Sequence, residues 1–374
     1  MPTYADLDVY ADLVDAARAS GPLFPEAFVT PTTVREALHF TGGSDEPQDV
    51  ATVSRWSKDG VDGEEISWSV GYGPQTRAFF LKPAGATGRL PGIVALCDHG
   101  HYKFYGKEKI ADGPDGPVAP VGPFRDGYYS GRAFANDYAR AGYAVLVHDT
   151  FLFGSRKFPL EAMPELDRRL ADTVGATLGH GAIDPEVLRY HGAAYLHEHI
   201  VAKYCDLLGT SLAAITAHED RLALEYLASR DDVDADRLAS IGFSGGGLRS
   251  ALLGATSDRL GARVVAGMIS TYEPLLSRHV IPHTWMLFPA GWSRHGDYPD
   301  IAACPAPRPL LIQSALGDQM FTEAGIRAAD ARIRLYYDRA DAAGAYRARF
   351  YDGPHRFDQE MQDDALAWLG ETLG

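Results

Sequence analysis

The stretch LASIGFSGGGLRSALLGA, residues 238–255, decides the fold. Its first six residues are mostly apolar, as expected of a strand buried on both faces. The pentapeptide GFSGG at 242–246 follows, and then come small and apolar residues that indicate a helix. A strand, a tight glycine-flanked turn and a helix form a nucleophile elbow, which exposes a serine hydroxyl above the edge of a sheet. The sequence therefore predicts Ser244 as a nucleophile.

Other strand-like segments lie on both sides of this elbow. Apolar runs predict strands at 66–72, 76–81, 92–97, 143–147, 264–269, 310–315 and 347–351. Helices are expected at 128–141, 212–226 and 322–340 and near the C-terminus, and an acidic turn at 231–236. Strands that alternate with helices predict an α/β fold whose mostly parallel central sheet is flanked by helices.

The chain is expected to form a single domain over 1–374 with three additions. Residues 1–50 are predicted to be an N-terminal helical extension. Residues 155–205 are predicted to be a lid-like helical insertion, and residues 271–306 a second, aromatic-rich insertion over the active site. The long Gly- and Pro-rich loop after the 92–97 strand also favours a functional role, because structureless loops of this length are uncommon.

Charge and composition exclude several classes of function. The formal net charge is −15, so nucleic acid and anionic membranes are not expected as partners. No segment has the length of a membrane span and no secretory signal is recognised, so a cytoplasmic location is expected. The three cysteines are far apart and form no C-x-x-C pair, which argues against a disulfide framework or zinc module. The oligomeric state cannot be inferred.

A serine nucleophile needs a base and an acid, in the chain order Ser, acid, His. His355 fits the base, because it lies in a loop between the last predicted strand and the last helix. Asp318 fits the acid, since it follows the 310–315 strand and side chains at the carboxyl end of a strand reach the crevice. Glu273 is the rival acid because it closely follows the preceding strand, whereas Asp352 lies too close to His355 in sequence.

The oxyanion hole should use two backbone N–H groups. One belongs to Gly245, directly after the nucleophile, and the other is assigned to His101 in the loop DHGHY at 98–102. The paired histidines of this loop lack a convincing third ligand, and His197 and His199 point to different faces of a helix. No metal and no cofactor are therefore expected.

Three motifs carry a resemblance to a known family. They are DHGH at 98–101 with GKEK at 106–109, DTFLFGSR at 149–156, and HGDYPDI at 295–301 followed by APRPLL at 306–311. With these motifs the chain resembles the acetyl xylan esterase-like and dienelactone-hydrolase-like α/β hydrolases over roughly residues 75 to 370. The resemblance implies an α/β-hydrolase fold and ester hydrolysis by a Ser–Asp–His triad. Dienelactone hydrolases proper carry cysteine at the elbow, where this chain has Ser244.

The expected activity is that of a serine-dependent carboxylic ester hydrolase acting through an acyl-enzyme on a small-molecule ester. A short acyl group, acetyl above all, on a polar alcohol such as a sugar is favoured, partly because the second insertion is rich in aromatic rings, which suit sugar faces. A peptidase, thioesterase or C–C hydrolase would use the same triad, and a non-catalytic binding protein would need a broken one. Fold and triad alone do not separate these alternatives.

Overall fold

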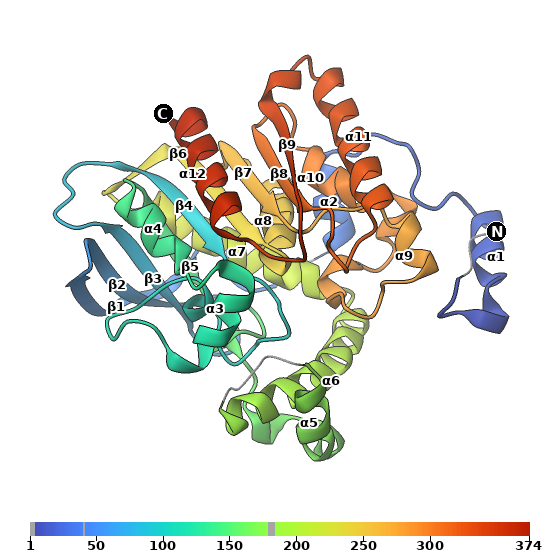
Figure 1. Cartoon of the computed structure of the whole chain (residues 1–374), viewed down its shortest axis with the longest axis horizontal. Coiled ribbons are helices and arrows are strands. Elements are labelled where there is room, and N and C mark those ends of the chain that lie inside the picture. Colours follow the sequence, from blue (N-terminus) through green and yellow to red (C-terminus); the bar gives the residue numbers. More distant parts are fainter. Residues whose placement is uncertain (1–3, 40–41, 179–183) are drawn as a thin grey trace.

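The computed structural model describes residues 4–39, 42–178 and 184–374, and a nine-stranded sheet lies at its centre (Figure 1). The strands are β1 (Gln48–Lys58), β2 (Val61–Ser69), β3 (Thr76–Pro83), β4 (Leu90–Leu96), β5 (Ala144–His148), β6 (Val233–Phe243), β7 (Ala262–Ala266), β8 (Leu310–Ala315) and β9 (Tyr346–Tyr351). Their spatial order is β1-β2-β3-β5-β4-β6-β7-β8-β9. The pairs from β1 to β5 are antiparallel, and every pair from β5 to β9 is parallel. The predicted, mostly parallel sheet is confirmed.

Helices cover both faces of this sheet. The α-helices are α1 (Leu13–Ala19), α2 (Pro31–Leu38), α3 (Gly122–Tyr129), α4 (Phe134–Arg140), α5 (Glu165–Leu178), α6 (Pro185–Leu207), α7 (Leu212–Ala228), α8 (Gly245–Thr256), α9 (Glu273–Ser277), α10 (Tyr298–Ala303), α11 (Glu323–Arg339) and α12 (Gln359–Leu373). Side chains of α3, α4 and α12 pack on one face, and those of α2, α8, α10 and α11 pack on the other. In β4, Ile93 packs in the hydrophobic core formed with α3, α4 and α12. The next residue, Val94, packs in a separate core that includes α7. Both faces of the parallel strands are therefore buried, which explains their uniformly apolar sequences.

Three segments differ from the sequence predictions for local reasons. β1 was not predicted, because this edge strand is exposed along nearly its whole length and shows no apolar face. The helix predicted at 128–141 is two helices, α3 and α4, which are separated where Ser130 and Gly131 adopt φ of 55° and 73°. The acidic turn predicted at 231–236 is wrong from its third residue on, because β6 already begins at Val233.

The two segments that the sequence predicts to be insertions, here called the first insertion (155–205) and the second insertion (271–306), follow β5 and β7 in the chain. In the first, α5 and α6 lie side by side and project from the body of the molecule (Figure 1). The second contains α9, α10 and two short 3₁₀ turns, one of them at Trp285–Leu287. Across the described ranges, no single helix is both long and apolar enough to cross a membrane; α6 and α7 reach that composition only as a pair bent by 88°.

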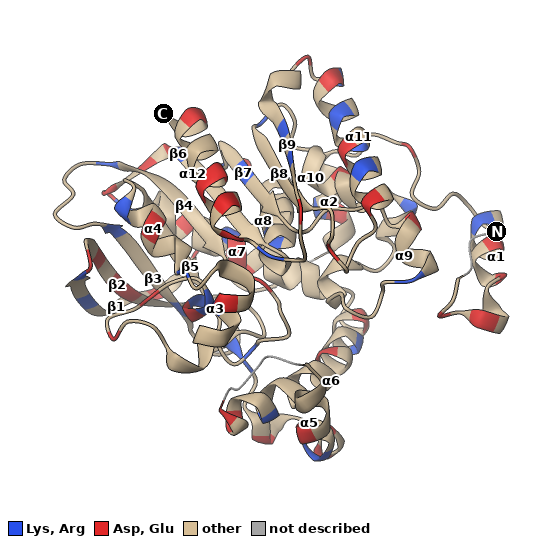
Figure 2. Ribbon diagram, viewed as in Figure 1, with Lys and Arg blue, Asp and Glu red and all other residues tan. Residues whose placement is uncertain are grey.

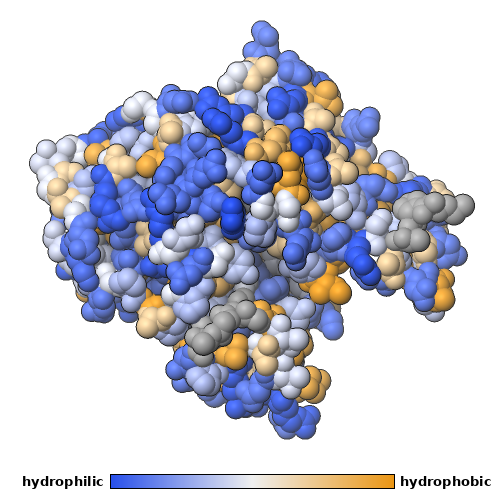
Figure 3. Space-filling view, in the orientation of Figure 1, coloured by the Kyte–Doolittle hydropathy of each residue, from blue (hydrophilic) through white to orange (hydrophobic). Residues whose placement is uncertain are grey.

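The charge of the chain is spread over its surface. Figure 2 shows Asp and Glu on many separate helices and loops, interspersed with Lys and Arg. The face seen in Figure 3 is mostly hydrophilic, with hydrophobic residues in small separate groups. The acidic residues behind the net charge of −15 are thus distributed over many elements in this view.

Candidate active site

Ser244 lies at the sharp turn between β6 and α8. Its φ and ψ are 53° and −124°, a region that residues with a side chain rarely adopt, and such strain costs about 1–3 kcal/mol. Two backbone hydrogen bonds hold the turn: Ser244 N–H donates to Ala266 O (2.8 Å) and Leu248 N–H donates to Ser244 O (3.0 Å). The surrounding structure thus maintains a strained conformation that presents the hydroxyl.

The glycines around Ser244 are required by the closeness of the neighbouring backbone. A Cβ at Gly242 would lie 2.2 Å from the carbonyl oxygen of Gly246. A Cβ at Gly246 would lie 2.1 Å from the carbonyl oxygen of Leu96, at the end of β4. The pentapeptide therefore lets β6, α8 and β4 meet closely enough to place Ser244 at the sheet edge.

His355 and Asp318 extend a hydrogen-bonded chain from the Ser244 hydroxyl. His355 lies between β9 and α12, and its Nε2 is 2.8 Å from Ser244 Oγ. Its Nδ1 is 2.6 Å from Asp318 Oδ2, so Nδ1–H donates to the carboxylate and Nε2 accepts from the hydroxyl. Asp318 Oδ1 accepts the backbone N–H of Met320 at 2.8 Å. Both carboxylate oxygens are thus engaged, which fixes the orientation of the ring.

The other acids weighed from the sequence lie elsewhere. Glu273, at the start of α9, forms an ion pair with Arg18 at 2.6 Å, and its side chain is half exposed. Asp352 is exposed at the surface of the loop before His355. Of the three acids, only Asp318 is within hydrogen-bond distance of His355 among the contacts of the described residues.

The turn after β4 lies directly beside the elbow. A Cβ on Gly245 would be 2.6 Å from the backbone nitrogen of His99, which shows how closely the two segments approach. Gly100 and His101 have φ of 52° and 53°, so the chain turns sharply here. The backbone N–H of His101 points to His99 Nδ1 at 3.2 Å. The structure therefore brings Gly245 and His101 to the same cavity as Ser244.

That cavity has a volume of about 190 Å³ and lies among Ser244, His355 and the turn after β4. Its outer wall comes from both insertions: Leu178 ends α5, and 282–284 precede the Trp285–Leu287 turn. The volume is below the roughly 300–1,000 Å³ typical of sites for drug-sized ligands. The space next to Ser244 therefore suits a small group.

No protein-family model matches the chain. A protein named "Putative hydrolase YtaP", from Bacillus subtilis (strain 168), is 22% identical over 297 residues, which cover 79% of this chain and 83% of that protein. The crystal structure of a "putative acetyl xylan esterase" from Bacteroides fragilis NCTC 9343 aligns with a TM-score of 0.63 at 17% identity, covering 91% of this chain and 81% of the other.

Two further solved structures align over 92% of both chains. They are a glucuronoyl esterase from Solibacter usitatus, with a TM-score of 0.61 at 15% identity, and acetyl xylan esterase 1 from Thermoanaerobacterium sp. JW/SL YS485, with 0.54 at 14%. The chain has the α/β-hydrolase fold. The fold expected from the resemblance is thereby confirmed.

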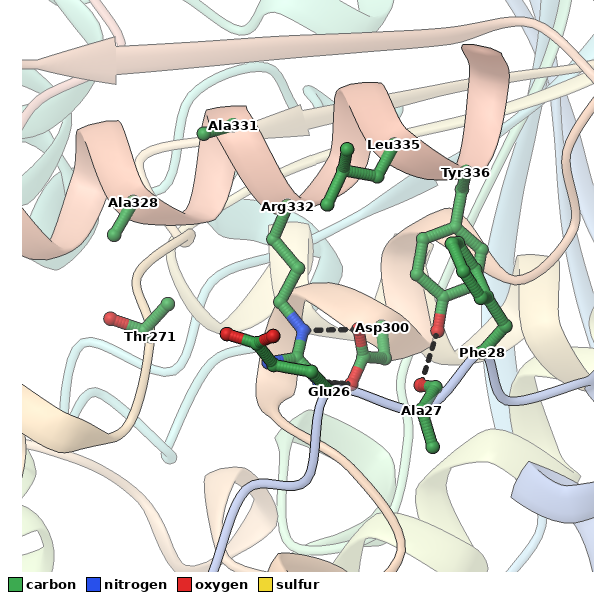
Figure 4. Close-up of a pocket in the computed structure, with 10 residues that line it drawn as sticks. All are labelled: Glu26, Ala27, Phe28, Thr271, Asp300, Ala328, Ala331, Arg332, Leu335 and Tyr336. Carbon is green, nitrogen blue, oxygen red and sulfur yellow. Dashed lines mark hydrogen bonds and ion pairs between the residues drawn. The ribbon is translucent and has the colours of Figure 1, made fainter. Parts of the chain in front are cut away.

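The cavity beside Ser244 is not the most voluminous one among the described residues. A pocket of about 600 Å³ lies between residues 26–28 and α11 (Figure 4). In it Arg332 forms an ion pair with Asp300 at 2.6 and 2.7 Å, and these two side chains satisfy each other. None of Ser244, Asp318 and His355 lines this pocket. Its size therefore does not make it the reactive site.

The sequence interpretation missed one buried carboxylate near the site. His197 is buried and His199 exposed, so the pair does lie on different faces of α6. Glu198, between them, is 5% exposed and reaches the turn after β4. Within the described residues, no group of three or more His, Cys, Asp or Glu side chains is placed to hold a metal ion.

Proposed function

We propose that this α/β-hydrolase is a serine-dependent carboxylic ester hydrolase that acts through an acyl-enzyme. The observation that carries the proposal is the hydrogen-bonded chain from Ser244 through His355 to Asp318, with the hydroxyl at a strained elbow that opens on a cavity. A weak nucleophile next to a base that a third group orients is the arrangement that nucleophilic catalysis requires.

In the first half of the reaction, Ser244 Oγ attacks the ester carbonyl carbon as its proton passes to His355 Nε2. The carbonyl oxygen becomes an oxyanion, which the N–H groups of Gly245 and His101 would stabilise. The His101 N–H, which donates to His99 Nδ1 at 3.2 Å, would be shared between that nitrogen and the oxyanion in a three-centre hydrogen bond. Asp318 holds the imidazolium in place. His355 then protonates the leaving alcohol as the C–O bond breaks, which leaves the acyl group on Ser244.

In the second half, water takes the place of the alcohol. His355 removes a proton from the water, whose oxygen attacks the acyl carbon and forms a second oxyanion at the same N–H groups. The intermediate collapses, Ser244 Oγ regains the proton from His355, and the carboxylic acid leaves. Ser244 thus changes from nucleophile to leaving group, whereas His355 again acts first as base and then as acid.

We further propose a short acyl group, acetyl above all, on a polar alcohol such as a sugar. The small cavity favours a short acyl group. The printed names of three aligned structures, two acetyl xylan esterases and a glucuronoyl esterase, support esters of carbohydrates.

Of the aromatic rings that the second insertion carries, Trp285 supports the binding of a sugar better than the buried ones do. Tyr272, Trp292 and Tyr298 are buried in the core, so packing accounts for them. Trp285 differs, because it is 41% exposed and follows residues that line the cavity. Its Nε1–H donates to His199 Nδ1 at 2.8 Å, which holds the ring in place. A fixed, exposed ring that directly follows the cavity-lining residue Thr284 in sequence can pack against one face of a sugar.

A chain-length series of p-nitrophenyl esters, followed by acetylated sugars, tests the proposal. We expect an optimum at acetyl or propionyl and turnover of at least one acetylated sugar. An optimum at eight carbons or more would reject the short acyl group, and a short-acyl optimum without activity on any acetylated sugar would reject the carbohydrate. No turnover of any ester, with turnover of peptides, thioesters or C–C substrates, would reject the esterase.

The cytoplasmic location expected from the sequence belongs to this proposal, and fractionation of the native cells would test it.

A further inference from the structure

Glu198 on α6 receives hydrogen bonds from two other parts of the chain. Its Oε2 is 2.7 Å from His99 Nε2 and also accepts from Lys103 Nζ, both in the loop after β4. Its Oε1 accepts the hydroxyl of Thr284 at 2.8 Å and the backbone N–H of Trp285 at 3.1 Å. One carboxylate therefore joins the first insertion, the second insertion and the loop that carries the His101 N–H.

This carboxylate is ionised in spite of its burial. Burial alone would raise the pKa of Glu198, but the charge of Lys103 and the hydrogen bonds from Lys103 and His99 hold that pKa well below its ordinary value. Burial lowers the pKa of His99, which Glu198 only partly opposes, so the ring is neutral at neutral pH. A neutral ring beside a carboxylate carries its proton on the nitrogen that faces it. His99 Nε2–H therefore donates to Glu198, and Nδ1 remains an acceptor.

The acceptor on His99 determines where the His101 N–H lies. Nδ1 takes that N–H at 3.2 Å, across a turn in which Gly100 and His101 both have positive φ. Positive φ is unfavourable for His101, so external contacts must hold the turn. The His99 ring supplies such a contact, and Glu198 fixes the ring. His99 is itself 5% exposed and lines the cavity of Ser244.

We propose that Glu198 is a positioning residue for the oxyanion hole: by orienting the His99 ring, it holds the turn at 99–101, and with it the His101 N–H, at the cavity that Ser244 also lines. The inference rests on the proposed ester hydrolysis, because it assigns an oxyanion contact to that N–H. The proposal also gives α6 a role in positioning the groups that bind the oxyanion.

Glu219 on α7 offers a matched control for a purely structural effect. It is 1% exposed, forms an ion pair with Arg156, and accepts the Tyr72 hydroxyl at 3.0 Å and the Phe151 N–H at 2.8 Å. Its burial and its set of donors thus resemble those of Glu198. Neither Glu219 nor these partners line the cavity of Ser244.

The test compares Glu198→Gln with Glu219→Gln in the full chain. Gln keeps the shape but has only one acceptor oxygen, so its NH₂ must face one pair of the former donors. Removing a single oxyanion donor costs about 10²–10³ in kcat, and a displaced donor costs less. We expect kcat on p-nitrophenyl acetate to fall on the order of 10- to 100-fold in Glu198→Gln, with KM within about threefold. Glu219→Gln should lower the melting temperature to a similar extent and leave kcat within about threefold.

Two further readouts separate positioning from general damage. The acid limb of the pH profile of kcat/KM should stay unchanged in Glu198→Gln, because His355 and Asp318 are intact. His99→Gln, which breaks the same relay without leaving a buried charge unpaired, should lose kcat to a similar extent. The kcat of the double variant should be no lower than that of the less active single variant, because both substitutions act through the same hydrogen bonds of the His99 ring.

Several outcomes would overturn the proposal. They are a kcat of Glu198→Gln within threefold of wild type, a loss confined to KM, an equal kcat loss in Glu219→Gln, and losses that multiply in the double variant. If Glu198→Gln does not fold, His99→Gln and its kcat decide the question alone. Wild-type protein that turns over no ester would instead reject the proposed function, which the wild-type assay shows before any variant is compared.

Discussion

Replacing Asp318 by Asn should disable His355 by forcing the wrong ring tautomer. In the native site Oδ1 accepts the Met320 N–H at 2.8 Å and Oδ2 accepts His355 Nδ1–H at 2.6 Å. An Asn side chain has one oxygen and one NH₂ group. If the oxygen keeps the backbone N–H, the NH₂ faces His355 and donates to Nδ1. The ring proton then moves to Nε2, which can no longer accept the proton of Ser244.

The size of this effect follows from the lost base. In a serine protease triad the equivalent change lowers kcat about 10⁴-fold with the geometry intact. We expect a similar loss for Asp318→Asn, on the order of 10⁴ or about 5 kcal/mol in the activation barrier. Glu273→Gln serves as the control, because Glu273 pairs with Arg18 at the surface, and its activity should stay within about twofold. The assay is kcat on p-nitrophenyl acetate, with circular dichroism to verify folding. Activity of Asp318→Asn within tenfold of wild type, or a larger loss in Glu273→Gln, would refute the assignment.

Three further predictions concern metal, acid stability and the elbow. Dialysis against EDTA should leave the rate unchanged, and a loss that zinc restores would contradict the metal-free mechanism. Burial lowers the pKa of His283 from 6.5 to about 4. Between these pH values the His283 ring is protonated in the unfolded chain but not in the folded one. The free energy of unfolding therefore falls by up to about 3 kcal/mol as the pH is lowered from 6.5 to about 4. His283→Phe should flatten that decline in urea unfolding, and an unchanged decline would contradict it. Gly242→Ala should unfold the elbow or abolish activity, because its Cβ would lie 2.2 Å from Gly246 O, and a stable, fully active variant would show that the elbow can relax.

The sequence predicted the central part of the fold well because buried parallel strands have a strong local signal. The strand at 310–315 was predicted with the bounds that β8 has, and Ser244 was placed at the turn between β6 and α8. Both cases depend on short apolar runs bounded by glycines or polar residues, which are readable without tertiary contacts. The positions of Asp318 and His355 after their strands followed from the same signal and from the family resemblance.

Features that depend on distant contacts could not be predicted. β1 has Val50 and Val53 almost half exposed, so its pairing with β2 leaves no apolar pattern to recognise. Glu198 reads as a solvent-facing acid on a helix, yet its partner His99 comes from a segment 99 residues away. The aromatic rings of the second insertion were interpreted together as suited to sugar faces, but the packing of this segment against the core buries Tyr272, one of them. In each case the decisive neighbours are remote in sequence.

The central claim is that Ser244 is the nucleophile, and covalent labelling tests it most directly. Wild-type protein should react with a fluorophosphonate, gain the mass of one probe, and yield a modified peptide that contains Ser244. Folded Ser244→Ala should not gain that mass and should lose turnover on the order of a thousandfold or more. Labelling at a different residue, or Ser244→Ala activity within tenfold of wild type, would contradict the account.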